Sequence, residues 1–220
     1  MFVGALDLDP NLICHEMGLG HASALAPGNY GDIYCLMGKG RTFQNTRINP
    51  SNWLVAGDTN ANPISLHTRS GPGICAPYLY KLGWLQHIYW ISFFRNPETD
   101  ELFLGGGSLE GSIFANQGAP HVGSSRYIAI LITSQARQYG GTPPNYWIEY
   151  RIPVGFDAGF PNGIVILREV EVNDQSMLKT TIPAIINGVI SLPNIGYNLR
   201  VTEVDVPNQK ISYVIEKNYF

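Results

Sequence analysis

The chain has 220 residues, of which 45% are hydrophobic and only 14% are charged, and its formal net charge is −3. This hydrophobic share excludes an intrinsically disordered chain, and the small share of charges argues against long amphipathic helices. Lysine and arginine are scattered singly, so no basic stripe is present for binding a nucleic acid backbone. The 24 glycines and 15 prolines indicate frequent turns and favour β structure.

No apolar stretch approaches the roughly 20 residues that span a bilayer, so we expect no transmembrane helix. The first ten residues carry two aspartates and no basic residue, which is not the pattern of a signal peptide. We therefore expect either a cytosolic chain or one whose front is missing. Three cysteines allow one bridge and a free thiol, or three free thiols, so they do not decide the compartment.

The first region, residues 1–87, begins with a predicted short helix. Asp9 is a favourable N-cap residue for this helix, and Gly18 or Gly20 ends it, because glycine adopts left-handed backbone angles at low cost. A turn-rich stretch follows from residue 26 to residue 73, and long connections of this kind are usually functional or disordered. A second short helix is predicted at Ala76 to Leu85, stopping near its internal glycine at position 83.

The second region, residues 88–220, is predicted to be a sandwich of antiparallel β-strands. Short runs of β-branched and aromatic residues alternate there with turn residues. Near the end of the chain, Leu199 and Val201 alternate with polar residues, as in a strand with one buried face. The predicted strands are His87–Phe94, Ser112–Phe114, Arg126–Thr133, Tyr146–Ile152, Ile164–Val170, Tyr197–Val204 and Lys210–Glu216. The expected fold class is therefore α+β and mainly β.

A histidine–glutamate pair, His15 and Glu16, opens the sequence HEMGLGHAS. On a helix such a pair is typical of zinc peptidases, in which imidazoles bind the ion and the glutamate takes a proton from water. A second ligand normally lies four residues after the first, where this chain has Leu19. The next histidine is His21, which on an unbroken helix would point about 120° away from the first one. The two histidines meet only if the helix ends at Gly18 and the chain turns back.

Further motifs accompany the pair, in the order Gly18-Leu-Gly-His-Ala22, Tyr30-Gly-Asp32, Cys35-Leu-Met-Gly38 and Leu82-Gly-Trp-Leu85. In this order and spacing they resemble the gametolysin family of metzincin zinc peptidases. Three later segments of the chain resemble the sandwich region that follows the catalytic part in such secreted peptidases. They are Tyr146–Arg151, Gly155–Asp157 and Gly163–Ile166. The resemblance covers residues 12 to about 216.

The resemblance implies a zinc-dependent metalloendopeptidase that hydrolyses peptide bonds in proteins. Carried over by position, His15 and His21 are zinc ligands and Glu16 is the general base. Met37 would form the turn beneath the metal. The resemblance also implies an extracellular or cell-surface location and a protein or peptide substrate, such as an extracellular-matrix or cell-wall glycoprotein.

Two features depart from the family's pattern. The middle histidine of the zinc motif has no counterpart, since about four residues are missing between HEM and GLGH. The sheet that precedes the active-site helix in the family has no counterpart in the fourteen residues before His15. We therefore expect the C-terminal part of such a peptidase domain, with impaired activity. The candidates for the third ligand are Asp32, His67 and Cys14. Each also has a purely structural interpretation: Asp32 as the cap of a turn, His67 as a loop residue and Cys14 as a buried thiol.

Other titratable residues have structural interpretations. Glu149 and Arg151 lie on one face of a predicted strand, and Asp157 follows in a turn. This arrangement favours an ion pair within the sandwich over a catalytic pair of carboxylates. His87 and His121, at a strand start and in a turn, are interpreted as structural or solvated.

Two alternatives stay open from the sequence. The resemblance implies a disulfide between Cys35 and Cys75, with two buried thiols as the alternative. For function, the alternative to a peptidase is a non-catalytic protein whose β-sandwich binds a surface protein or glycan through exposed aromatic residues. The missing ligand favours this alternative, whereas the retention of His15, His21 and Met37 favours the enzyme.

Overall fold

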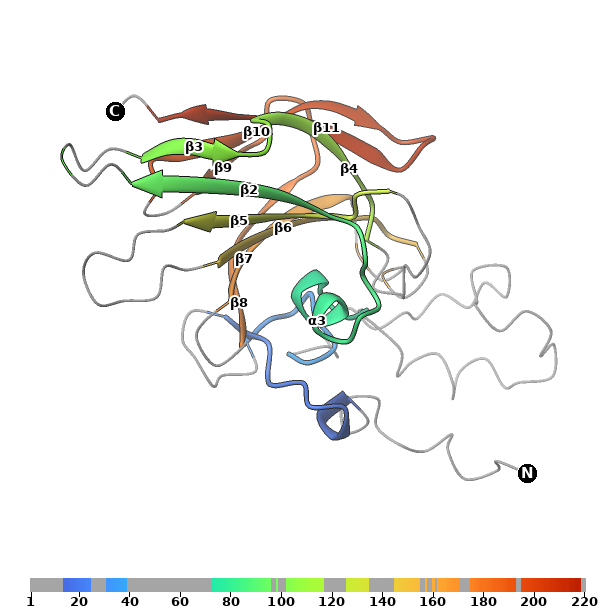
Figure 1. Ribbon diagram of the computed structural model, residues 1–220. Helices are drawn as coiled ribbons and strands as arrows, with labels where there is room; N and C mark the ends of the chain where they lie inside the picture. The colour runs from blue at the N-terminus through green and yellow to red at the C-terminus, as the bar shows by residue number, and fades with distance from the viewer. Residues whose placement is uncertain are drawn as a thin grey trace, which may run out of the picture.

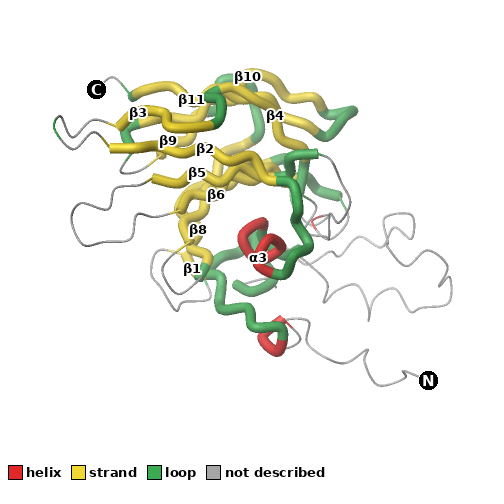
Figure 2. Tube along the Cα trace, viewed as in Figure 1, coloured by secondary structure: helices red, strands yellow, loops and turns green. Residues whose placement is uncertain are grey.

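The computed structural model describes residues 14–24, 31–38, 73–95, 98, 102–116, 126–134, 145–154, 157, 160, 162–170, 175–192 and 195–218. Within these ranges the chain is mainly β, with two sheets packed face to face and few helical residues (Figures 1 and 2). The predicted class, α+β and mainly β, is confirmed at this level. No helix in the described ranges is long and apolar enough to cross a membrane.

The larger sheet has seven strands in the order β1-β8-β7-β6-β5-β2-β3. They are β1 (Ser23–Ala24), β2 (Ile88–Arg95), β3 (Leu102–Gly106), β5 (Ala129–Ser134), β6 (Asn145–Arg151), β7 (Ile164–Val170) and β8 (Ser176–Pro183). The pair β2–β5 is parallel, so the prediction of an antiparallel sandwich over residues 88–220 is wrong for this pair. β1, which lies before that region, also pairs with β8 in parallel. Between β2 and β5 the chain visits the second sheet, which provides the crossover connection that parallel neighbours require.

The smaller sheet has four antiparallel strands in the order β4-β11-β10-β9. They are β4 (Glu110–Phe114), β9 (Val189–Leu192), β10 (Tyr197–Asp205) and β11 (Lys210–Lys217). In β10 the predicted alternation is confirmed, since Leu199 and Val201 are buried and Arg200 between them pairs with Glu216 of β11. One face of this sheet therefore packs inward and the other meets solvent.

The core between the sheets consists of β-branched, aliphatic and aromatic side chains from both layers. Ile91 and Phe93 of β2 and Ile130 of β5 come from the larger sheet, and Ile211 of β11 comes from the smaller one. The rings of Phe93 and Tyr197 meet across the interface with centroids 4.7 Å apart. Burying each such side chain contributes roughly 1.5–3 kcal/mol, so this layer is the main source of stability.

All seven predicted strands overlap strands of the structure, and Ile164–Val170 coincides with β7. Three strands longer than the two-residue β1 were not predicted, namely β3, β8 and β9. β8 is fully buried only at its first two residues, β9 has four residues, and β3 ends in two glycines. β3 has no β-branched residue and β9 has two, and the three in β8, Thr180 to Ile182, are followed at once by a proline, which is disfavoured within strands.

A short helix, α3 (Ala76–Lys81), lies against the outer face of the larger sheet (Figure 1). A second core cluster joins Leu79 of this helix to Leu131 of β5 and Trp147 of β6. The helix ends where predicted, because Gly83 has a φ of 72° and its N–H donates to the Tyr80 carbonyl at 2.9 Å. The first region of the chain therefore packs directly on strands of the second.

Candidate functional site

The predicted first helix ends in a glycine turn. Residues 14–16 are helical, and the beginning of the predicted helix lies outside the described residues. Gly18 has a φ of 81°; its N–H donates to the His15 carbonyl at 2.9 Å, and the Leu19 N–H donates to the Cys14 carbonyl at 3.1 Å. These two bonds form a Schellman motif, in which a glycine in the left-handed region is favoured. The chain thus turns back at Gly18, one of the two positions predicted for the helix end.

This turn brings the two candidate zinc ligands together. The ring centroids of His15 and His21 are 5.0 Å apart, with the rings edge to face. Nδ1 of His15 lies 2.9 Å from the carbonyl oxygen of Leu19. Since a carbonyl only accepts, Nδ1 carries a proton in this contact, and in the neutral form of the ring the lone pair that binds a metal is then on Nε2. Glu16, the candidate base, is exposed next to His15.

The loop that carries Met37 holds the backbone next to His21. The N–H of Ala22 donates to the carbonyl of Met37 at 2.8 Å, and the N–H of Asp32 donates to the carbonyl of Ala22 at 3.4 Å. The Met37 side chain is fully buried. A Cβ atom at Gly38 would overlap the Asp32 carbonyl oxygen, so only glycine fits at this close approach.

Tyr78 of α3 connects His21 to β8 of the larger sheet. Its hydroxyl donates to the His21 carbonyl at 2.7 Å and accepts the N–H of Ser176, the first residue of β8, at 3.2 Å. The tyrosine is 1% exposed. The sequence predicts the helix that carries Tyr78 but not this bridge, because the partners of the hydroxyl lie 57 and 98 residues away.

The described residues do not add a third ligand to the histidine pair. Within them, no group of three histidines, cysteines or carboxylates is placed to hold a metal ion. Asp32 caps a turn as expected, since its Oδ1 accepts the Tyr34 N–H at 2.8 Å, and its other oxygen pairs with Arg168. Cys14 is buried among apolar side chains, also as expected. His67 lies outside the described residues.

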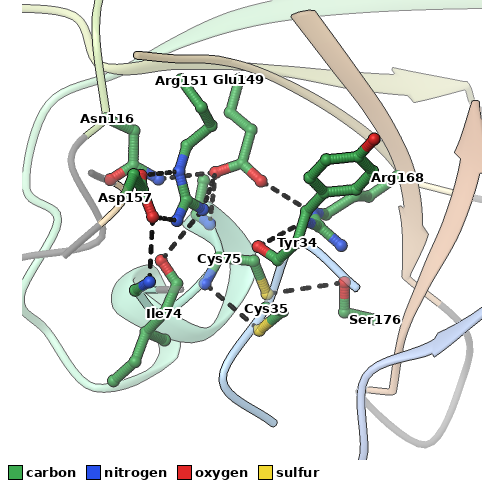
Figure 3. A network of polar contacts seen from close by, with 12 residues as sticks. Tyr34, Cys35, Ile74, Cys75, Asn116, Glu149, Arg151, Asp157, Arg168 and Ser176 are labelled. Atoms are coloured by element: carbon green, nitrogen blue, oxygen red, sulfur yellow. Dashed lines mark hydrogen bonds and ion pairs between the residues drawn. The ribbon is translucent and has the colours of Figure 1, made fainter. Parts of the chain in front are cut away.

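A buried network of charges lies between α3, the Met37 loop and the larger sheet (Figure 3). Its members are fully buried and alternate in sign, in the order Asp157, Arg151, Glu149, Arg168 and Asp32. Arg151 donates to both oxygens of Asp157 at 2.5 Å and to Glu149 at 3.4 Å. Nε of Arg168 donates to Glu149 at 2.7 Å. The predicted ion pair is confirmed, and Arg168 with Asp32 extends it.

Neutral groups complete the hydrogen bonding of this network. Oε2 of Glu149 accepts the N–H of Ala76 at 3.0 Å and the side-chain amide of Asn116 at 2.6 Å. Oδ1 of Asp157 accepts the N–H of Gly73 at 2.9 Å. Burial raises the pKa of both carboxyls, and the positive charge of Arg151 opposes that shift. Because the charges are buried and paired, we assign the network to structure: it ties the start of α3 to β6.

Arg168 was missed as a member of the network, although the sequence carries a signal for it. It lies in the strand Ile164–Val170, and the residues of this strand that precede the arginine are all buried and apolar. A buried charge requires a partner, and an arginine in such a run therefore indicates a buried carboxylate nearby. The partner, Asp32, lies 136 residues away, so the sequence does not identify it.

The three cysteines are buried free thiols. The N–H of Cys75 donates to Sγ of Cys35 at 3.4 Å, and the two sulfur atoms lie side by side in Figure 3. The thiol of Cys75 donates to the Ser176 hydroxyl at 3.7 Å. The structure therefore has the two buried thiols that the sequence left as the alternative to a disulfide. Burial, and secondarily Cys35, raises the pKa of Cys75.

Replacing Gly18 by alanine is expected to destabilise the protein by roughly 1–2 kcal/mol, because a Cβ atom is unfavourable in the left-handed region. No atom lies within 4 Å of the added methyl group, so strain of the backbone is the only cost. Urea unfolding of both proteins measures the difference. The matched control is Gly106→Ala, at a site with equal space and no positive φ, where we expect little change. Equal midpoints for Gly18→Ala and wild type would contradict the role of the turn.

The geometry defines a mainly β protein whose larger sheet carries, on its outer face, a short helix, a buried charge network and a nearby histidine pair. Comparison of the chain with protein-family models, with curated proteins and with solved structures finds no match. The resemblance to gametolysin peptidases therefore depends on the motifs quoted above and on the contacts that their residues make.

Proposed function

We propose that the chain is a zinc-binding protein of the gametolysin peptidase type, in which His15 and His21 hold the ion and Glu16 is the general base. The reaction is hydrolysis of peptide bonds in a protein or peptide substrate. The observation that carries the proposal is the 5.0 Å approach of two imidazole rings across a glycine turn. Histidines six residues apart face each other only because the chain reverses at Gly18.

The residues present suit zinc chemically. Neutral imidazole is a preferred ligand of this ion. Zinc-bound histidines usually donate their second ring N–H to a carbonyl or carboxylate, as His15 does to Leu19. The backbone of His21 is held by Tyr78 and the loop of Met37. Because two protein ligands leave several coordination positions open, we expect weaker binding than at a three-ligand site.

The chain's own groups have separate parts in this reaction. Zinc, when bound, supplies Lewis-acid polarisation of the peptide carbonyl and of a water molecule. Glu16 is exposed beside His15 and would accept the proton of the attacking water. The Met37 loop and Tyr78 would keep His21 in place. The fewer ligands predict slow hydrolysis, in agreement with the impaired activity expected from the sequence.

Titration of the full chain with zinc, with the heat of binding measured by calorimetry, tests the proposal. We expect one zinc ion per chain and at least a tenfold loss of affinity in His15→Ala and in His21→Ala, because each removes a ligand. His87→Ala is the matched control, since His87 is exposed at the start of β2 and should leave binding unchanged. Glu16→Gln should keep the zinc and lose casein hydrolysis. A wild-type chain that binds no zinc would exclude the peptidase proposal.

A second function is favoured by the small number of zinc ligands and by an exposed aromatic residue of the sandwich. The described residues supply two ligands where catalytic zinc has three, and Trp90 of β2 is 49% exposed on the sandwich. A non-catalytic protein would use such aromatic side chains to bind a surface protein or glycan. Two results would favour this function over the peptidase. The wild-type chain would bind zinc without hydrolysing any protein, and its signal on a glycan array would be lost in Trp90→Ala.

A further inference from the structure

Two asparagine–glycine pairs each lie directly before a strand of the sandwich. Asn162 and Gly163 precede β7, and Asn187 and Gly188 precede β9. Both asparagine residues are exposed. Glycine has no side chain to shield its own nitrogen, so this nitrogen can approach the side chain of the preceding residue. The two pairs are therefore chemically alike, and their backbone contacts distinguish them.

Three backbone hydrogen bonds hold the pair before β9. The N–H of Asn187 donates to the Val201 carbonyl at 2.8 Å, and the N–H of Gly188 donates to the Ile185 carbonyl at 3.0 Å. The carbonyl of Gly188 accepts the N–H of Val201 at 2.9 Å. Asn187 has a φ of 65°, a conformation that asparagine adopts more readily than most residues. The Gly188 nitrogen is thus fixed in the turn, and its proton is engaged.

The pair before β7 is held on one side only. The Gly163 carbonyl accepts the N–H of Ala184 at 2.9 Å. The Gly163 N–H donates to no acceptor among the residues that the structure describes, and its φ is not positive. The nitrogen beside the Asn162 side chain can therefore react without first breaking a hydrogen bond to any of these residues.

We propose that Asn162 is a site of spontaneous covalent modification, at which deamidation forms aspartate and isoaspartate, and that the fold protects Asn187. The inference is independent of zinc binding. A backbone amide that already makes hydrogen bonds must be released by a local opening before it reacts, and this opening costs free energy. Asn187 requires such an opening and Asn162 does not, so the two rates should differ by roughly tenfold or more.

The reaction needs water as its only co-reactant. The Gly163 nitrogen loses its proton and attacks Cγ of Asn162, which forms a cyclic succinimide. The bond from Cγ to the side-chain nitrogen breaks, and this nitrogen leaves as ammonia with the proton. Water then adds to one of the two ring carbonyl carbons and opens the ring to aspartate or isoaspartate. The net change is one amide and one water converted to one carboxylic acid and one ammonia.

Incubation of the folded full chain in water labelled with heavy oxygen, at mildly alkaline pH, tests the assignment. Trypsin digestion in ordinary water then separates the two asparagines, which fall in the peptides 152–168 and 180–200. By mass spectrometry we expect one labelled oxygen at Asn162, in both aspartate and isoaspartate, and roughly tenfold or more slower labelling at Asn187. In urea the two rates should become similar, because the protecting hydrogen bonds are lost.

Matched variants and a folding control make the outcome decisive. Asn162→Ser should remove the label at this position, whereas Asn187→Gly, which tolerates the positive φ, should leave the Asn162 rate unchanged. Far-UV circular dichroism follows folding during the incubation. Three results on the folded chain would overturn the assignment: Asn187 labelled as fast as Asn162, no label at Asn162 over a time in which it reacts in urea, or a labelled product without isoaspartate.

Discussion

Replacing Glu149 by leucine is expected to destabilise the protein by roughly 3–5 kcal/mol, as removal of one partner from a buried ion pair does. Glu149 accepts hydrogen bonds from Arg168 at 2.7 Å and from the N–H of Ala76 at 3.0 Å, and it also pairs with Arg151. Leucine leaves two guanidinium groups with a reduced counter-charge and leaves one backbone N–H without an acceptor. Urea unfolding followed by tryptophan fluorescence measures the loss of stability.

The control for this substitution is Glu169→Leu. Glu169 lies on β7 of the same sheet and pairs with Lys179 at 2.8 Å, but both side chains are partly exposed. A partly solvated pair contributes little, so we expect a change of less than about 1 kcal/mol. If Glu149→Leu and Glu169→Leu shifted the urea midpoint equally, the buried network would not be a major source of stability.

Replacing Gly38 by alanine is expected to cost roughly 2–3 kcal/mol, towards the upper end of the range for overpacking. The added Cβ atom would overlap the Asp32 carbonyl oxygen and lie 2.8 Å from that of Ala22. Both obstacles are backbone atoms, so the strain is relieved only if the Met37 loop moves away from the residue that follows His21. Thermal unfolding measures the loss of stability.

Zinc titration gives Gly38→Ala a second readout. If the Met37 loop positions His21, the variant should bind zinc more weakly at a temperature where it is still folded. Gly106→Ala, at a glycine with no atom within 4 Å, should change neither stability nor zinc affinity. A Gly38→Ala protein as stable as wild type would show that the loop is not packed as the structure has it.

Local features of the site were accessible from the sequence. The ends of both short helices were predicted from Gly18 and Gly83, because a Schellman turn depends on residues within one turn of the glycine. The approach of His15 and His21 followed from the same turn. The ion pair of Arg151 with its two carboxylates involves partners at most six residues away, so strand alternation was enough to indicate it.

The contacts that hold the site to the sheet were not accessible in this way. The Tyr78 hydroxyl reaches Ser176, 98 residues later, and Arg168 reaches Asp32 across 136 residues. An isolated polar residue in an apolar segment indicates that a partner exists but not which residue it is. The polar strand β8 was missed for a related reason, since pairing with neighbours on both sides stabilises it more than its own side chains do.

By itself, the sequence determined the mainly β class, most strands of the two sheets and the glycine-ended helices, and it supplied the candidate residues on which the proposed chemistry depends. These properties depend on local backbone preferences and on the two-residue period of buried side chains. Only the tertiary structure decided the parallel pairing of β2 with β5, the full charge network and the contact of Cys35 with Cys75. Burial selects such long-range partners, because each buried charge or backbone donor must find one wherever the packing of the sheets places it.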